Sequence, residues 1–173
     1  MGFFVLKTII RFSLPMRYFS KIIFLIFIRV SFAQDEADTW NIIQDSIFTP
    51  NCISCHDHGL YFAEQSDLIL AEDVAYEELI NTVPNNAAAA EDGLTLVGTD
   101  GIVSLYDSYL WEKINAPDFE HFYSDHPEYG SLMPLGVDFL TNGQLEYIRQ
   151  WIVAGAPEFG AVADINLLED TSR

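Results

Sequence analysis

The stretch from Pro50 to Leu60 reads PNCISCHDHGL and contains the only two cysteines of the 173-residue chain. Two residues separate Cys52 from Cys55, and His56 follows the second cysteine directly. Two sulfurs and an imidazole placed so closely can form a redox dithiol, bind a metal ion, or anchor a covalent cofactor. The rest of the sequence is needed to decide between these three chemistries.

The N-terminal segment is basic and apolar, as secretory signal peptides are. No acidic residue precedes Asp35, and the apolar run Ile22–Ile28 leads to Ser31-Phe32-Ala33, which offers small residues at the positions that a signal peptidase inspects. A membrane-spanning helix needs roughly 20 apolar residues, and Arg29 interrupts this run earlier. We therefore predict a signal peptide over residues 1–33, with cleavage after Ala33.

This leader predicts a periplasmic or secreted protein without a stable membrane span once the leader is cleaved. An uncleaved N-terminal anchor is the alternative. The segment that starts at Met16 would alone make a complete signal peptide, so residues 1–15 can also derive from an upstream start codon. The folded part is expected over residues 34–173, with its core at about 38–156.

The predicted mature chain is strongly acidic. It contains all 26 Asp and Glu residues and three basic residues, Lys113, Arg149 and Arg173. This charge excludes nucleic acid and anionic lipid surfaces as expected partners. Because the acids are scattered, we expect them mainly to keep an exported protein soluble; the alternative is that they steer a basic redox partner protein.

Export places the cysteines in an oxidising compartment, where a free dithiol is unusual. A thioredoxin-like pair follows a strand, but the approach Trp40–Phe48 has helical periodicity. A zinc site needs four ligands, and only His121 and His126 could complete it. The CxxCH spacing is instead typical of haem attachment. We predict one covalent haem c, bound through Cys52 and Cys55, with His56 as an iron ligand.

The second axial ligand is predicted to be Met133, the only methionine after the leader. Pro134 disfavours a helical conformation at Met133, and Gly130 and Gly136 bracket the segment, so a loop is expected to present the sulfur. The alternatives are that Met133 only fills the core, or that His121 or His126 is the ligand. His58 is too close to His56 along the chain to reach the opposite face of the iron.

Apolar periodicity predicts a small all-α domain wrapped around the haem. A first helix has Trp40, Ile43 and Ile47 on one face and is expected to end at Pro50. Further helices are expected near residues 72–81 and 104–114. The last helix is expected to begin with a capping box at Thr141 and Gln144 and to stop at Gly155. The three tryptophans are expected in the core.

Several motifs together resemble exported class I-like monohaem cytochrome c domains. The resemblance covers roughly residues 38–156 and rests on five stretches: PNCISCH, Leu68-x-Leu70 with Ala75-Tyr76, Ser108–Ile114, Met133-Pro134-x-Gly136 and Trp151–Ala156. It implies that Cys52 and Cys55 hold the haem, with His56 proximal and Met133 distal. The chain departs from the pattern in the long segment Asn115–Gly130, where shorter relatives run almost directly to the methionine.

Iron with a histidine and a methionine ligand has no open position for a substrate, which predicts an electron carrier rather than an enzyme. If Met133 does not bind the iron, a gas sensor or a peroxidase-like protein is the alternative. A thiol-disulfide oxidoreductase and a calcium-binding role remain as further hypotheses, although the sequence lacks an Asp-x-Asp-x-Asp-Gly loop. Lys113 and Arg149 either pair with the haem propionates or form ordinary surface ion pairs.

Overall fold

The described chain begins with a continuous helical stretch that leads into the cysteine motif. A computed structural model describes residues 37–173, which form one compact unit; the predicted signal peptide lies outside these residues. Helix α2 (Thr39–Ile43) continues into the π-helical segment η1 (Gln44–Phe48) and then into α3 (Thr49–Asn51). The helix ends only after Asn51, at Cys52, where φ is −121°.

The prediction that Pro50 ends the first helix is therefore wrong. Pro50 lies in the first turn of α3, directly after the π-helical segment. A proline inside a helix lacks the N–H group and its ring crowds the carbonyl group four residues earlier. The wider π-helical turn ahead of Pro50 accommodates both effects. The helix can therefore continue to Asn51, directly before Cys52, where the cysteine motif begins.

The first half of the unit contains four further short helices: α4 (Ile53–His56), α5 (Tyr61–Ser66), α6 (Ala75–Leu79) and α7 (Ala87–Glu91). Helix α6 occupies the centre of the helix expected at 72–81. Helix α7 was not predicted; the Asn86 side chain caps it by accepting a hydrogen bond from the amide of Ala89. Two isolated β-bridges, Ile80 with Val97 and Thr95 with Ser108, cross-link the loop that follows.

The helix expected at 104–114 is two helices, α8 (Ile102–Tyr106) and α9 (Tyr109–Ile114). The break occurs because the Ser108 hydroxyl donates to the carbonyl oxygen of Ser104, while the amide of Tyr109 donates to Thr95 at 2.8 Å instead of continuing the helical ladder. The segment after α9 contains η2 (Ala116–Asp118), α10 (Phe119–Asp125) and η3 (Pro127–Tyr129).

The last long helix, α11 (Asn142–Val153), has the predicted capping box, in which Thr141 and Gln144 exchange side-chain to backbone hydrogen bonds. The chain beyond residue 156, outside the predicted core, returns to pack on this helix. Its 3-10 helix η4 (Ile165–Glu169) lies against α11, and a Cβ atom added to Gly143 would clash with the carbonyl oxygens of Leu167 and Asp170. The close approach of the C-terminal segment thus requires glycine at position 143.

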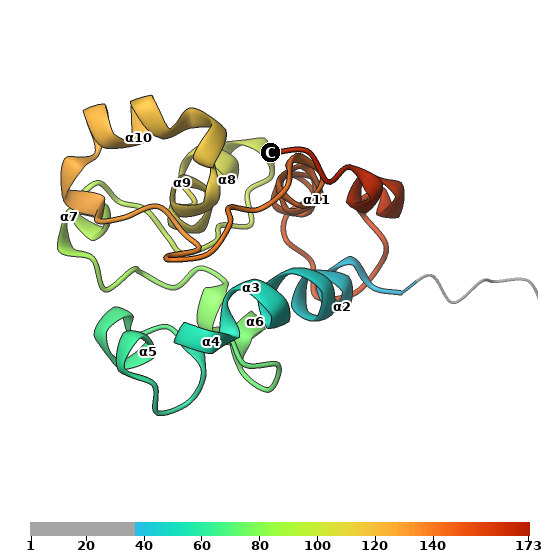
Figure 1. Ribbon diagram of the computed structural model, residues 1–173, viewed down its shortest axis with the longest axis horizontal. Coiled ribbons are helices and arrows are strands. Elements are labelled where there is room, and N and C mark those ends of the chain that lie inside the picture. The colour runs from blue at the N-terminus through green and yellow to red at the C-terminus, as the bar shows by residue number, and fades with distance from the viewer. Residues whose placement is uncertain (1–36) are drawn as a thin grey trace, which may run out of the picture. The chain divides into compact units, whose positions relative to one another are not determined.

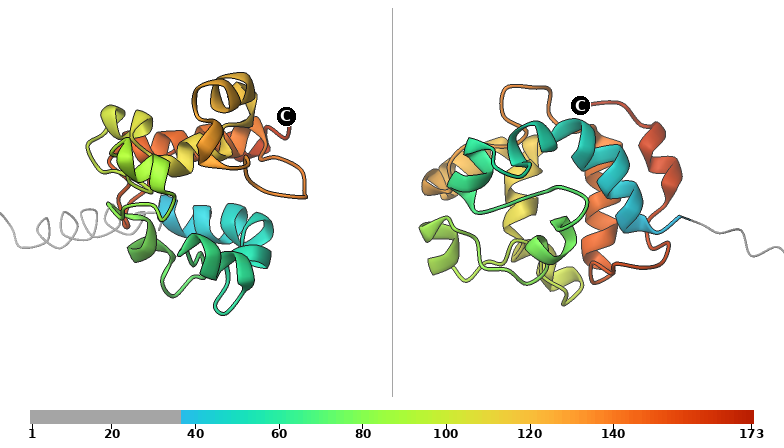
Figure 2. Two further views of the ribbon diagram at one scale, coloured as in Figure 1. Left: turned by 90° about the vertical axis from the view of Figure 1, so that its left-hand side faces the viewer. Right: turned by 90° about the horizontal axis from the view of Figure 1, so that it is seen from below.

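The main core joins the first and last helices. Trp40 of α2 stacks on Trp151 of α11 with ring centroids 5.3 Å apart, and both are buried; Trp111 is only partly buried against the same core. Figures 1 and 2 show the segments α2 to α6 on one side of this unit and α8 to α11 on the other.

The all-α class is confirmed, since residues 37–173 contain no β-strand. Within these residues no helix is long and apolar enough to cross a membrane.

Candidate functional site

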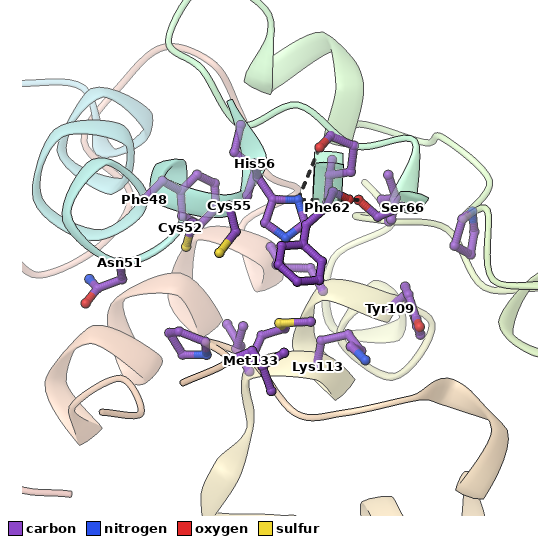
Figure 3. A pocket seen from close by; sticks show the side chains of 18 of the residues that line it. Phe48, Asn51, Cys52, Cys55, His56, Phe62, Ser66, Tyr109, Lys113 and Met133 are labelled. Carbon is purple, nitrogen blue, oxygen red and sulfur yellow. Dashed lines mark hydrogen bonds between the residues drawn. The ribbon is translucent and has the colours of Figure 1, made fainter. Parts of the chain in front are cut away.

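A pocket of about 520 Å³ lies between the two groups of helices and contains all four residues predicted for the site. Cys52, Cys55 and His56 line it from α4 and the turn before it, and Met133 lines it from the loop between η3 and α11. In Figure 3 the cysteine and histidine side chains lie on one wall and Met133 on the facing wall. The fold therefore brings together residues that are separated by about half of the chain.

One helical turn sets the spacing of the cysteine motif. The amides of Cys55 and His56 both donate to the carbonyl oxygen of Cys52, each at 3.0 Å, and the two sulfur atoms extend into the pocket (Figure 3). Both thiols are free. Burial, together with the neighbouring Cys55, raises the pKa of the Cys52 thiol to about 12. Such a thiol stays protonated at neutral pH, whereas thiol-disulfide exchange uses a thiolate.

The His56 ring is oriented by a backbone carbonyl group. Its Nδ1 lies 3.2 Å from the carbonyl oxygen of Leu68, with the Ser66 hydroxyl at 3.4 Å. A carbonyl oxygen can only accept, so this contact requires the proton on Nδ1; in that tautomer of the neutral ring, Nε2 has the lone pair. Figure 3 shows this second nitrogen directed into the pocket, toward the side that holds Met133. A hydrogen bond to the outer nitrogen of this kind is typical of histidines that bind metals.

Met133 lies on a non-helical loop, as predicted, and is half-buried. Its amide donates to the carbonyl oxygen of Lys113 at 2.7 Å, and the preceding amide, of Leu132, donates to the Tyr123 hydroxyl at 3.3 Å. These two bonds fasten the loop to α9 and α10. They hold the Met133 side chain over the pocket, where its sulfur faces the wall that carries His56 (Figure 3).

The remaining lining is mostly apolar. It includes two phenylalanines and several aliphatic side chains from both halves of the unit, among them Phe48, Phe62, Leu70, Leu79, Leu96, Leu110, Ile114 and Leu140. A concave, apolar pocket with few polar groups is typical of small-molecule and cofactor sites. Two thiols, an imidazole nitrogen with a free lone pair and a thioether opposite it are donors that suit a haem.

Lys113 is the cation of this pocket. Its Nζ donates to the carbonyl oxygen of Tyr129 at 2.8 Å and lies 5.5 Å from the ring centre of Tyr109, and burial lowers its pKa to about 8. Arg149 does not line the pocket; it forms hydrogen bonds of 2.6 and 2.7 Å with Glu146. Of the two basic residues considered from the sequence, only Lys113 is therefore placed to interact with a pocket ligand.

The other three histidines lie outside the pocket lining. His58 is exposed and pairs with Asp73 at 3.0 Å, which raises the pKa of its imidazole. His121 and His126, the alternative iron ligands, come together with Glu112 instead. This arrangement does not place either of them beside His56 or Met133.

Two contributors to the site were missed by sequence reasoning. The Leu68 carbonyl group orients His56, but a backbone group leaves no signal in the residue type. Tyr109 lines the pocket and donates its hydroxyl proton to the carbonyl oxygen of Tyr129 at 2.8 Å. The only sequence signal for it was its position in the helix predicted at 104–114.

Comparison of the chain with known families, curated proteins and solved structures finds no match to any of them.

Proposed function

We propose that this chain is an exported monohaem c-type cytochrome that transfers single electrons through a haem ligated by His56 and Met133. One observation carries the proposal: the CxxCH residues and the only methionine of the mature sequence line opposite walls of the same apolar pocket. The cytochrome c-like character of the fold is part of this proposal. So are the absence of enzymatic activity and the periplasmic or secreted location.

In this proposal Cys52 and Cys55 anchor the haem by thioether bonds. His56 offers Nε2 to the iron, and its Nδ1 bond to Leu68 fixes the orientation of the ring. Met133 offers its sulfur from the opposite wall. A bound haem c supplies reversible one-electron chemistry at its iron, and a thioether ligand favours a comparatively positive potential. The apolar lining keeps water away from the site and stabilises the less charged, reduced state.

The pocket geometry favours an electron carrier over the two main alternatives, a haem protein with an open sixth position and a thiol-disulfide oxidoreductase. An open sixth position would require a distal wall without a ligand, whereas the Met133 loop is fastened over the pocket by backbone hydrogen bonds. A thiol-disulfide oxidoreductase would be expected to carry its cysteines after a strand, and residues 37–173 contain none. The acidic mature sequence suits a basic redox partner protein rather than nucleic acid.

The decisive experiment is a pyridine haemochrome assay on protein exported together with a haem-ligation system. We expect a spectrum of the type given by two thioether bonds, with one haem per chain that stays attached to the denatured polypeptide. Cys52→Ala combined with Cys55→Ala should abolish the attachment. His58→Ala is the matched control, because His58 lies two residues from His56 but outside the pocket lining, and it should leave the spectrum unchanged.

A wild-type chain that is exported and folded but carries no covalent haem would disprove the proposal. Attached haem that is five-coordinate or water-bound in the ferric state would instead support the open-site alternative. A coordination spectrum that is unchanged in Met133→Ala but altered by mutation of His121 or His126 would assign the distal ligand to a histidine.

A further inference from the structure

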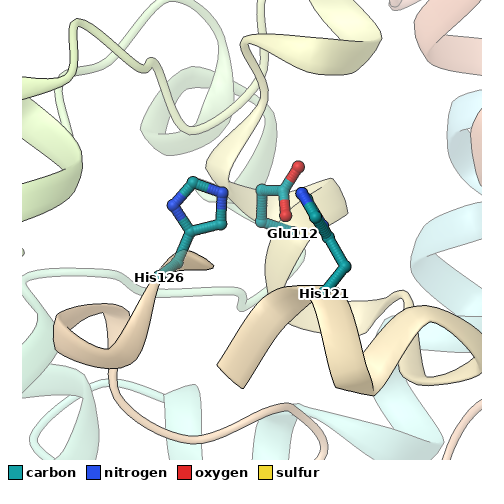
Figure 4. Close-up of side chains that lie close together, drawn as sticks. All are labelled: Glu112, His121 and His126. Atoms are coloured by element: carbon teal, nitrogen blue, oxygen red, sulfur yellow. The ribbon is translucent and has the colours of Figure 1, made fainter. Parts of the chain in front are cut away.

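A second cluster of potential ligands lies outside the pocket, and two of its three residues belong to the long segment Asn115–Gly130 that distinguishes this chain from the family it resembles. Glu112 of α9, His121 of α10 and His126, which follows α10, each offer one ligand atom to this cluster. These atoms all lie within 4.8 Å of one another. Figure 4 shows both imidazole rings on either side of the Glu112 carboxylate. None of the three residues lines the haem pocket.

We propose that Glu112, His121 and His126 bind a divalent transition-metal ion of the Zn²⁺ type. Two imidazoles and one carboxylate are a donor set that zinc uses in proteins, with a fourth position left for water. Bonds of about 2.0–2.2 Å at tetrahedral angles place two ligands of one zinc ion roughly 3.4 Å apart. The three ligand atoms, which lie within 4.8 Å of one another, would approach to that separation on binding. Oxygen-seeking Mg²⁺ and Ca²⁺ are disfavoured by the two imidazoles.

The surroundings hold the histidines in place for this role. The His126 ring stacks on Tyr129, with centroids 4.4 Å apart and an interplanar angle of 16°. Tyr129 is itself buried, and its hydroxyl donates to Asp92 at 2.7 Å. The ligand ring therefore rests on an aromatic side chain that cannot easily move. Such preorganisation lowers the entropic cost of binding an ion.

Carboxylates flank both nitrogens of His121. Nδ1 lies 3.7 Å from Asp118, and Nε2 lies 3.4 Å from Asp125. Whichever nitrogen binds the ion, a carboxylate stands beside the other one, as is usual around metal-bound histidines. The acidic composition of the predicted mature chain also raises the local concentration of cations.

The site would fasten the segment that leads to Met133. An ion shared by Glu112, His121 and His126 links α9 to α10 and to the start of η3. The next residues along the chain include Tyr129, whose carbonyl oxygen accepts from Lys113 and Tyr109. The metal therefore stabilises the distal wall of the pocket without entering it. This inference goes beyond the proposed function, because it does not depend on haem being bound.

The test is a calorimetric titration of the purified full chain, with or without attached haem, with ZnCl₂, and with MgCl₂ and CaCl₂ as reference titrations. We expect one Zn²⁺ per chain with micromolar or tighter affinity, and no comparable binding of the other two ions. Glu112→Gln, His126→Ala and His121→Asn should each weaken binding at least about 10-fold. His58→Ala is the matched control, because this exposed histidine also faces an aspartate but lies outside the cluster, and it should bind Zn²⁺ as the wild type does.

Thermal unfolding supplies a second readout. Zn²⁺ should raise the melting temperature of the wild type and of His58→Ala by several degrees, and that of His126→Ala much less. No saturable one-site binding in the wild type would overturn the proposal without any variant. An equal loss of binding in His58→Ala, or none in His126→Ala, would also overturn it. Failure of haem attachment with intact Zn²⁺ binding would reject the proposed function and leave this site standing.

Discussion

The backbone amide of Met133 donates a 2.7 Å hydrogen bond to the carbonyl oxygen of Lys113, so that a thioether and a half-buried cation lie side by side on one wall of the pocket. The two residues are expected to affect a bound haem differently. Met133 would act through the proposed bond to the iron, and Lys113 through its charge. Separate substitutions can therefore distinguish the two contributions.

Replacing Met133 by alanine should leave the haem covalently attached but remove its distal ligand. We expect the midpoint potential to fall by on the order of 100 mV, because thioether ligation favours ferrous iron, and the ferric protein to bind cyanide or imidazole faster. Spectro-electrochemistry and ligand-binding kinetics measure both effects. Phe139→Ala, on the same loop, exposed and outside the pocket lining, is the control and should behave like the wild type. An unchanged coordination spectrum in Met133→Ala would contradict the prediction.

Replacing Lys113 by methionine should lower the midpoint potential by tens of millivolts, since a nearby positive charge favours the reduced, less positive haem. The interaction is on the order of 1 kcal/mol for charges roughly 10–15 Å apart at an effective dielectric constant of about 20. The midpoint potential should be measured at pH 6.5, because this pH lies below the lowered pKa of Lys113, about 8, and the side chain is therefore charged. Arg149→Gln is the matched control, because Arg149 lies outside the pocket lining; an equal shift in that variant would refute a local effect.

Substituting Gly143 by alanine should destabilise the protein although the position is helical. Alanine normally stabilises a helix relative to glycine by roughly 0.5–1 kcal/mol. Here the added methyl group meets the carbonyl oxygens of Leu167 and Asp170, and relieving such overpacking typically costs about 1–3 kcal/mol. Urea unfolding should therefore show a lower midpoint. A midpoint equal to or above that of the wild type would mean that the C-terminal segment does not pack against α11 in this way.

The ion pair between Glu146 and Arg149 should give a small, pH-dependent contribution to stability. The Arg149 guanidinium donates to both carboxylate oxygens of Glu146 and lowers the pKa of that carboxyl group. Both side chains are about one third exposed, so Glu146→Gln is expected to cost only about 0.3–1 kcal/mol at neutral pH. A lowered pKa gives stability that is present above the ordinary glutamate value, about 4.3, and is lost as the pH falls through the folded value.

Urea unfolding of the wild type and of Glu146→Gln at pH 7 and at pH 3 tests whether this stabilisation is lost as the pH falls. The difference between the two proteins should shrink at the lower pH. Arg149→Gln should lower the free energy of unfolding at pH 7 by a similar amount. If the difference in unfolding free energy between wild type and Glu146→Gln grows on acidification, the ion pair is not the cause of that difference.

Local sequence signals predicted the parts of the fold that depend on neighbouring residues. The capping box of Thr141 and Gln144 and the burial of Trp40 and Trp151 are confirmed, because a cap and an apolar stripe are encoded within one or two helical turns. The passage of the helix through Pro50 was mispredicted. It depends on the π-helical turn that precedes the proline, which has no comparable residue signature.

Contacts between distant segments were the least predictable. The carbonyl group of Leu68 meets His56 across 12 residues, and the chain beyond residue 156 returns to α11; neither contact has a periodic pattern in the sequence. His121 and His126, considered from the sequence as alternative iron or zinc ligands, lie instead beside Glu112, which belongs to another helix. For the pocket itself, the sequence identified residues that the structure brings together, whereas their proposed chemistry stays a prediction.

The walls of the pocket come from opposite ends of the described chain, with Cys52, Cys55 and His56 early and Met133 and Leu140 late. Any group that bonds to both walls therefore closes a loop of about half the polypeptide and ties the first helices to the last. Binding to the native state alone adds its free energy to that of folding. If the proposed haem bonds to both walls, the loaded chain should therefore resist proteolysis far better than the unloaded one.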